Sequence, residues 1–271
     1  MIIDCHTHIG EPPAKRRVWN ALFSNGEKLH MDMGDEIDMS IDNLLSDMDH
    51  QKIERAFVMS FPGWASNEHL ADVVKKHSQR IRGFGYVDNP KLPTSVEQLE
   101  YCVESLGLKG LKLHPGMQMF EASDPAIFPL ISKAVDLDVP ILIHSFQWPD
   151  GYTHYSYPHH IDVLANKFPQ AKIIVGHMGG LRFMDTISIG QRDNVLLEIS
   201  FTLKMMEELH GTEFVNNFIK MVGVQNLVLG SDWAGERIRM SSPMKLIHRL
   251  DLTNEEKGLI LGGNAERFVG S

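Results

Sequence analysis

Short apolar runs rich in Val, Ile, Leu and Phe recur along the 271 residues of the chain, and each is bounded by Gly, Pro or polar residues. Runs of this length and composition are typical of buried parallel strands. The eight strands that we expect span residues 1–8, 55–61, 81–87, 110–114, 140–146, 172–177, 194–200 and 226–231.

Amphipathic segments of helical length separate these strands. The helices that we expect span residues 40–51, 66–79, 94–105, 125–137, 159–167, 181–190, 204–221, 241–250 and 254–268. Eight strands that alternate with helices predict an α/β fold, a closed (β/α)8 TIM barrel, as a single domain over residues 1–271. A doubly wound open sheet is the alternative architecture.

Functional residues of such a barrel lie at the carboxyl ends of its strands and in the loops that follow them. Five of the fourteen histidines fall at expected strand ends. Two connections, residues 10–39 and residues 147–158, are longer than usual, and we expect both to lie over the mouth of the barrel.

The composition is that of an ordinary globular protein, with 43% hydrophobic and 23% charged residues. A formal net charge of −9 without a dense basic tract argues against nucleic acid or an anionic membrane as a partner. No apolar run is long enough to span a bilayer. The first residues lack the pattern of a signal peptide, and the two cysteines, Cys5 and Cys102, cannot form a multi-bridge framework. We therefore expect a cytoplasmic protein with reduced cysteines.

The segment Asp4-Cys5-His6-Thr7-His8 ends the first strand. The two-residue period of a strand predicts Asp4, His6 and His8 on one face and Cys5 and Thr7 on the other. A lone histidine at a strand end is usually a hydrogen-bonded core residue. Two at this spacing, joined by histidines from other strand ends, indicate a metal site.

Three further strand ends carry side chains that suit a metal site. His144 ends the fifth strand, His177 ends the sixth, and Asp232 ends the eighth, which lies beside the first in a closed barrel. Each has a structural alternative: a buried histidine bonded to a carbonyl, a loop shaped by glycines, or a helix N-cap. As a set, imidazoles and one carboxylate suit zinc or another divalent ion and leave a position for water or substrate.

Lys112 and His114 end the fourth strand on one face, and burial of the lysine requires a partner. Lys112 is expected to pair with a core carboxylate such as Asp4, to hold a substrate anion, or to be carbamylated as a ligand that bridges two metals. His114 is a further candidate for a second metal or for substrate, although Pro115 can turn it toward the loop.

These motifs resemble a known family. The His-x-His motif, the histidines of strands five and six, the aspartate of strand eight and the segment Gly263-Asn264-Ala265-Glu266-Arg267-Phe268 resemble the amidohydrolase superfamily over essentially the whole chain. The His-Met-Gly-Gly segment from His177 and the Gly-Ser-Asp-Trp segment ending at Trp233 are similar to its amidohydrolase 2 branch. That branch includes aminocarboxymuconate-semialdehyde decarboxylase and gamma-resorcylate decarboxylase.

The resemblance implies a mononuclear site in which one divalent ion, Zn²⁺ or else Mn²⁺, is bound by His6, His8, His144 and Asp232. His177 then hydrogen-bonds the metal-bound water or the substrate. Binuclear members of the superfamily instead carry a second metal, bridged by a carboxylated lysine from the strand that holds Lys112 here, so two metals are the alternative. The resemblance also implies a homo-oligomer, with a dimer as the expectation.

The leading functional hypothesis is a metal-dependent hydrolase that acts on a small amide, lactone or related carbonyl compound. The metal lowers the pKa of bound water toward about 7. Asp232 is the general base, and His177 and the metal stabilise the developing oxyanion. The alternative is non-oxidative decarboxylation of a small unsaturated or aromatic carboxylic acid, with Asp232 or metal-bound water as the proton donor. A non-catalytic metal-binding barrel is the second alternative.

Side chains near the expected mouth are weaker candidates for contacts with a small-molecule substrate. Aromatic side chains could pack against an unsaturated ring, and arginines could bind a carboxylate. These candidates are Arg16, Arg17, Trp64, Trp148, Tyr152, Arg182 and Trp233. The structural alternative for each is ordinary packing or solvation.

Overall fold

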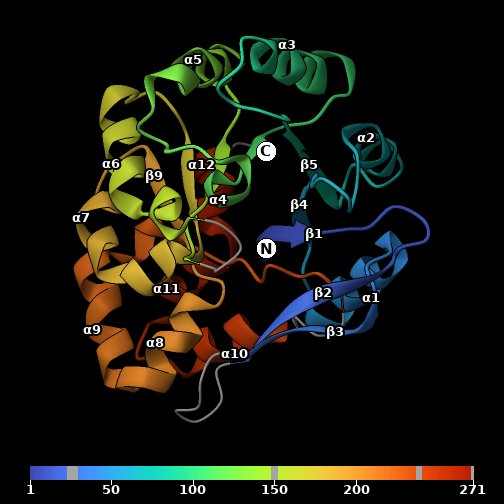
Figure 1. The fold of residues 1–271 in the computed structure, drawn as a ribbon. Coiled ribbons are helices and arrows are strands. Elements are labelled where there is room, and N and C mark those ends of the chain that lie inside the picture. The colour runs from blue at the N-terminus through green and yellow to red at the C-terminus, as the bar shows by residue number, and fades with distance from the viewer. Residues whose placement is uncertain (23–29, 148–151, 236–239, 270–271) are drawn as a thin grey trace.

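The computed structural model describes residues 1–22, 30–147, 152–235 and 240–269, and the side chains of residues 15–35 and 241 lie outside that description. Eight parallel strands form one sheet, and helices surround it (Figure 1), as the alternation predicted. In sheet order, the strands are β1 (Ile3–His8), β4 (Arg55–Met59), β5 (Ile81–Tyr86), β6 (Leu111–Leu113), β7 (Ile141–His144), β8 (Ile173–Gly176), β9 (Val195–Glu198) and β10 (Leu227–Val228).

The sheet closes into a barrel between its first and last strands. The Cys5 N–H donates to the Leu229 carbonyl at 2.8 Å, just beyond the end of β10. The Asp232 N–H donates to the His6 carbonyl at 2.8 Å. These bonds join the two ends of the sheet, so the fold is the closed TIM barrel and the open-sheet alternative is wrong.

The helices lie outside the barrel and begin at local sequence signals. Ser40 and Ser66 each accept a hydrogen bond from a backbone N–H in the first turn of the helix that follows them, as N-cap residues do. The α-helices are α1 (Ile41–Gln51), α2 (Asn67–Lys76), α3 (Thr94–Glu100), α4 (Pro115–Gln118), α5 (Phe128–Asp136), α6 (Pro158–Lys167), α7 (Thr186–Ile189), α8 (Thr202–His210), α9 (Thr212–Val222), α10 (Ser241–Arg249), α11 (Asn254–Gly258) and α12 (Asn264–Val269). No described helix is long and apolar enough to cross a membrane.

Several of the expected helices differ from the structure, and glycines account for two of the differences. Gly211, with φ of 85°, divides the expected helix 204–221 into α8 and α9. The expected helix 181–190 falls on the 3-10 helix η4 (His177–Asp185) and the short α7. Glycines with positive φ at the start of η4 interrupt a regular α-helix there.

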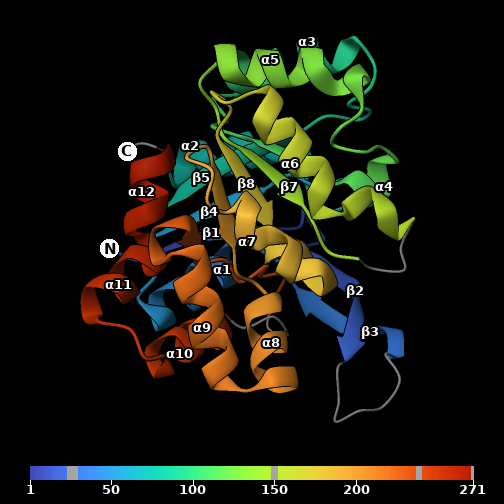
Figure 2. The same ribbon diagram turned by 90° about the vertical axis from the view of Figure 1, so that its left-hand side faces the viewer.

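The connection 10–39 holds a hairpin that the sequence analysis did not predict. Its antiparallel strands are β2 (Lys15–Leu22) and β3 (His30–Asp38). Figure 2 shows this hairpin on the opposite side of the molecule from α12 and the two termini. The hairpin therefore lies away from the end of the barrel that α12 covers.

Apolar side chains from seven strands fill the inside of the barrel beside α12. This cluster includes Cys5, Phe57, Phe84 and Leu142, and Ala265 of α12 packs into it. A larger apolar cluster lies between the barrel and the surrounding helices. The inner cluster occupies the amino-terminal end of the strands and leaves the other end to polar side chains.

A register shift in β1 changes the faces predicted for its residues. β1 pairs with β4 at Asp4 and again at Thr7, and the pairing is irregular between them. Cys5 joins the inner apolar cluster, while His6 contacts the polar side chains described below. The prediction of strict alternation, with Cys5 on the face away from the histidines, is therefore wrong. β-bulges of this kind re-aim side chains at functional ends of barrels.

Candidate active site

Polar side chains meet at the carboxyl-terminal end of the barrel. The strand ends and the residues that follow them contribute His6, His8, Lys112, His114, His144, His177, Glu198 and Asp232. All are buried except Asp232, whose side chain is 20% exposed. The strand ends singled out in the sequence therefore come together in one buried cluster with one partly open carboxylate.

His6, His8 and Asp232 form a group whose ligand atoms lie within 4.8 Å of one another. Asp232 Oδ1 lies 3.2 Å from His6 Nε2 and 3.1 Å from His8 Nε2. His6 Nδ1 lies 2.9 Å from Glu198, whose carboxylate accepts a hydrogen bond from Nδ1–H, so that the lone pair lies on Nε2. Unshared electron pairs on His6 Nε2 and Asp232 Oδ1 thus face each other. A borderline divalent ion between imidazole and carboxylate ligands fits this arrangement.

Glu198 is a site residue to which the sequence analysis gave no role. Its Oε2 accepts hydrogen bonds from His6 Nδ1, from the His177 N–H at 3.0 Å and from Ser200 Oγ at 2.9 Å. Its Oε1 accepts the Ser200 N–H at 2.5 Å. His6, His177 and Glu198 also form a second group with metal-ligand spacing. A glutamate inside an otherwise apolar strand was the signal that could have found it.

Gly230 makes room for that carboxylate. A Cβ atom at residue 230 would overlap the Glu198 side chain. The glycine before Ser231 therefore has a packing role in the site.

Lys112 contacts His6, one of the three residues of the first group, and not Asp4, the carboxylate named in the sequence analysis. Its Nζ lies 2.8 Å from His6 Nε2. Asp4 is bound elsewhere, because Ser231 donates to it through Oγ at 2.6 Å and through its N–H at 3.0 Å. The expected pairing of Lys112 with Asp4 is therefore wrong, and Lys112 approaches the same nitrogen that a metal would use.

His144 lies next to this cluster, but its ligand atoms belong to neither group found among the described residues. Its Nδ1 lies 3.1 Å from His177 Nε2, and its Nε2 lies 3.1 Å from the Phe146 carbonyl. The His114 ring stacks on the His144 ring at 3.8 Å between centroids. Metal ligation by His144 therefore stays a prediction.

His177 and Asp232 share an unusual backbone conformation. Their φ angles are 59° and 54°, in the left-handed region that residues with a Cβ seldom adopt. Such residues occur preferentially at functional sites, where the surrounding structure holds them in place. Here each one lies at the first turn away from its strand and carries its side chain into the cluster.

Burial keeps the histidines of the cluster neutral. It lowers the pKa of His6, His8, His114 and His144 below the usual value of 6.5, and that of His177 to about 4. Neutral imidazoles are the form that binds metals.

The pKa values of the charged groups in the cluster are shifted as well. Burial lowers the pKa of Lys112 to about 8 and raises that of Glu198 to about 7. Burial also raises the pKa of Asp232, but the hydrogen bond from His8 and the basic groups around the carboxylate, Lys112 among them, outweigh it, and the net shift is downward. Asp232 is therefore ionised near neutral pH and able to accept a proton or bind a cation.

Comparison with known proteins places the chain in a family. A family model described as Amidohydrolase matches residues 3–271. The chain belongs to the amidohydrolase family. The family resemblance drawn from the sequence is thereby confirmed for this amidohydrolase.

One similar protein of named activity is a decarboxylase. The 2-amino-3-carboxymuconate-6-semialdehyde decarboxylase of Dictyostelium discoideum is 22% identical over 240 residues, which cover 75% of this amidohydrolase and 65% of that protein. The matched region thus spans just under two thirds of the relative.

Solved structures of similar fold were also found. A probable 2-pyrone-4,6-dicarboxylic acid hydrolase of Acinetobacter baumannii has a TM-score of 0.71 at 13% identity, covering 100% of this chain and 99% of that one. The 5-carboxyvanillate decarboxylase of Novosphingobium aromaticivorans, with bound manganese, has a TM-score of 0.70 at 17% identity, covering 100% and 97%. At these identities the likeness shows the shared barrel.

The residues proposed to contact substrate are placed unequally in this amidohydrolase. The Trp64 ring meets the His8 ring edge to face at 5.1 Å between centroids. Tyr152 is exposed and packs on Tyr155. Arg182 forms an ion pair with Asp185 on the surface. The side chains of Arg16 and Arg17, and all of Trp148, lie outside the described residues.

Trp233 requires a correction. Its side chain is fully buried, and its indole N–H donates to Asp47 in α1 at 2.7 Å. It therefore packs between the barrel and α1, and the expected substrate contact is wrong.

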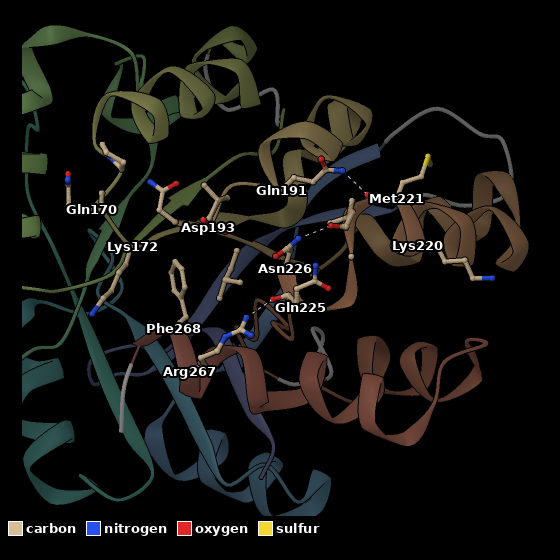
Figure 3. A pocket seen from close by; sticks show the side chains of 17 residues that line it. Gln170, Lys172, Gln191, Asp193, Lys220, Met221, Gln225, Asn226, Arg267 and Phe268 are labelled. Atoms are coloured by element: carbon tan, nitrogen blue, oxygen red, sulfur yellow. Dashed lines mark hydrogen bonds between the residues drawn. The ribbon is translucent and has the colours of Figure 1, made fainter.

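A cavity of about 750 Å³ lies at the other end of the amidohydrolase barrel, where β8 and β9 begin and near α9 and α12. Lys172, Lys220 and Arg267 line it, but Figure 3 shows Lys172 and Lys220 pointing away from each other. Lys172 is paired with Asp138, and Arg267 donates to the Gln225 carbonyl. The cavity has no converging reactive groups among the described residues, so we place the chemistry at the histidine cluster.

Proposed function

We propose that this amidohydrolase is a metal-dependent hydrolase of a small amide, lactone or related carbonyl compound. The observation that carries the proposal is the convergence of His6, His8 and Asp232 at 3.1–3.2 Å, with Glu198 behind His6. One divalent ion per chain, Zn²⁺ or Mn²⁺, would be held by these three residues, with His144 as the fourth ligand. Manganese in the N. aromaticivorans relative supports an ion of this class.

Each residue of the site has a separate role in the proposed hydrolysis. A bound divalent ion lowers the pKa of water toward about 7 and polarises a carbonyl. Asp232 combines an ionised side chain with partial exposure, and it accepts the proton of the attacking water and returns it to the leaving group. His177, which follows β8, would hydrogen-bond the water or the substrate. Trp64, against His8, forms part of the pocket wall.

Decarboxylation of a small unsaturated or aromatic acid is the second candidate. Two of the relatives above are named as decarboxylases. In this scheme water at the metal, or Asp232 once it has accepted a proton from that water, would protonate the carbon from which the carboxyl group leaves as carbon dioxide. The two reactions share the same ligand set, and their products separate them.

The test begins with bound metal, measured by elemental mass spectrometry on protein purified without a chelator or a histidine tag. About one ion per chain, lost in His6→Ala/His8→Ala, supports the mononuclear site. About two would favour a carbamylated Lys112. No metal after reconstitution with Zn²⁺ or Mn²⁺ contradicts both reactions and favours a non-catalytic barrel.

Substrate panels of lactones, amides and carboxylated aromatic acids follow the metal measurement. Release of an acid from a lactone or amide supports hydrolysis. Release of carbon dioxide from an aromatic acid, without hydrolysis of any panel member, would replace the leading proposal with decarboxylation.

A further inference from the structure

A chain of buried hydrogen bonds extends from Glu198 across the site. Ser200 Oγ lies 2.9 Å from Glu198 Oε2 and 2.7 Å from His177 Nδ1. His177 Nε2 lies 3.1 Å from His144 Nδ1, and His144 Nε2 lies 3.1 Å from the Phe146 carbonyl. Every side chain that takes part is at most 4% exposed. Which atom of each hydrogen bond carries the proton therefore depends on the bonded groups themselves and not on bulk water.

With neutral histidines, the protons along these hydrogen bonds can be arranged in two ways, which we call the first and the second order. If Ser200 donates to Glu198, it accepts from His177 Nδ1, and His177 Nε2 then accepts from His144. If His144 instead donates to the Phe146 carbonyl, it accepts from His177 Nε2, and Ser200 must donate to His177. Each order leaves one mismatch, because two acceptors then face each other at one end of the chain.

The Glu198 end favours the first order. The N–H groups of His177 and Ser200 are donors in any state, and both point at the Glu198 carboxylate. A hydroxyl that donates to a carboxylate forms a charge-assisted bond, about twice as strong as a neutral bond such as that from imidazole to a carbonyl. We propose that Glu198 and Ser200 are positioning residues that hold His177 with its proton on Nδ1 and an unprotonated Nε2.

The Glu198 carboxylate also fixes the tautomer of His6. Glu198 Oε2 accepts a hydrogen bond from His6 Nδ1–H at 2.9 Å, so in the first order both imidazoles beside Glu198 present an unprotonated Nε2. One acidic side chain on β9 thus orients a ligand from β1 and, through one hydroxyl, a histidine that follows β8. A carboxylate behind a metal-binding histidine raises metal affinity by fixing its tautomer.

The inference deepens the proposed function and rests on it for the role of His177. In the first order, the single lone pair of His177 Nε2 accepts from His144 Nδ1. For the role given to His177 in the proposed function, water or substrate would take the place of His144 Nδ1 as the donor to this lone pair. Stabilisation of an oxyanion, the role expected from the sequence, requires a donor and therefore the second order. The resting order makes His177 an acceptor before substrate arrives.

Nitrogen NMR of the histidine rings in metal-free protein tests the assignment without turnover. The His177 signals are those lost in His177→Asn. We expect the native spectrum to show His177 protonated at Nδ1, and Ser200→Ala to shift it toward the Nε2-protonated form. The His6 signals should stay unchanged, because Ser200→Ala leaves its bond to Glu198 intact. An Nε2-protonated His177 in the native protein, or no change in Ser200→Ala, overturns the proposal.

Ser60→Ala is the matched control. Ser60 is a buried serine that follows β4, and its Oγ donates to the Ala65 carbonyl at 2.9 Å. Loss of this hydroxyl should leave the His177 signals in place. A shift of equal size in this variant would mean that any buried serine perturbs the site, which also counts against the proposal.

The part of the proposal that concerns Glu198 and His6 is tested by measuring metal affinity, using isothermal titration calorimetry with Zn²⁺. In Glu198→Gln the amide cannot accept from every donor that surrounds the carboxylate, and we expect about 10- to 100-fold weaker binding. Ser200→Ala should weaken binding less than Glu198→Gln does, because the bond between Glu198 and the proposed ligand His6 remains. Equal affinity in Glu198→Gln and the native protein overturns this part. Absence of binding by the native protein instead contradicts the proposed function, and the NMR result still decides the tautomer of His177.

Discussion

Asp232 meets two requirements of a general base that no other carboxylate of the cluster meets together. Its side chain is 20% exposed, whereas Glu198 is fully buried. Its pKa is lowered, whereas burial raises the pKa of Glu198 to about 7. These properties support Asp232 as the general base of the proposed reaction, and Glu198 contacts the histidines beside it.

Asp232→Asn should reduce turnover of an identified substrate by about 10²- to 10⁴-fold, because an amide cannot accept the water proton. Metal content should survive in part, since His6 and His8 remain. The measurement is kcat together with metal per chain. Asp42→Asn, an exposed carboxylate in the first turn of α1, is the control and should retain activity. Unchanged turnover in Asp232→Asn would contradict both proposed reactions.

Residue types at strand ends identified most of this cluster, and the exceptions have physical causes. Glu198 was not assigned because a single carboxylate has no spacing that distinguishes a hydrogen-bond acceptor from a ligand. Trp233 was misplaced because its neighbour Asp232 turns with φ of 54°, and the indole then packs against α1. A sequence pattern gives the strand that carries a side chain but not the rotation of the chain beyond it.

At the scale of elements, apolar runs predicted all eight barrel strands, because strands covered on both faces need continuous apolar sequence. The β2–β3 hairpin was missed because its strands carry many charged residues and no apolar run. The alternation in β1 failed at a bulge, which no residue type announces. Periodicity therefore predicts elements that bury a face and misses those defined by local geometry.

Gly211 and Gly258 form a matched pair for testing backbone conformation. A Cβ atom at either position would meet nothing within 4 Å, but only Gly211 has a positive φ, of 85°. Gly211→Ala should lower the free energy of unfolding by about 1 kcal/mol, because alanine disfavours that conformation. Gly258→Ala, in α11, should leave stability unchanged or raise it by about 0.5–1 kcal/mol. Urea unfolding measures both, and equal effects would contradict the conformational explanation.

The contact between β1 and the segment after β10 should make stability depend on pH. Burial raises the pKa of Asp4 to about 7, above its value of 3.8 as a free side chain. The folded protein therefore binds a proton that the unfolded chain has lost. The contribution of Asp4 to stability is complete below about pH 4 and disappears as pH rises through about 7.

Asp4→Asn should remove this dependence. The asparagine oxygen can accept the two N–H groups that Asp4 Oδ1 accepts, and its amide can donate to Ser231 Oγ. The free energy of unfolding of the variant, measured with a chelator present, should decline less between pH 4 and 7 than that of the native protein. Identical slopes would show that Asp4 is ionised in the folded state across this range.

For the whole molecule, ligands from distant parts of the chain make metal binding a property of the folded barrel. A ligand that binds only the folded state stabilises it by about 2.7 kcal/mol at a concentration 100 times Kd. Saturating Zn²⁺ or Mn²⁺ should therefore raise Tm, and the His6→Ala/His8→Ala variant should show no such rise. Differential scanning calorimetry at several metal concentrations measures both. A native Tm that does not change would contradict a site built from His6, His8 and Asp232.

The closure of the barrel has a consequence for protein synthesis. The Asp232 N–H meets the carbonyl of His6, a residue whose number is lower by 226. While a ribosome is still making the last quarter of the protein, one edge of β1 has no partner, and exposed strand edges invite association with other chains. Contacts this distant in sequence also form slowly. The nascent chain therefore exposes this edge of β1 until the residues beyond β10 emerge from the ribosome.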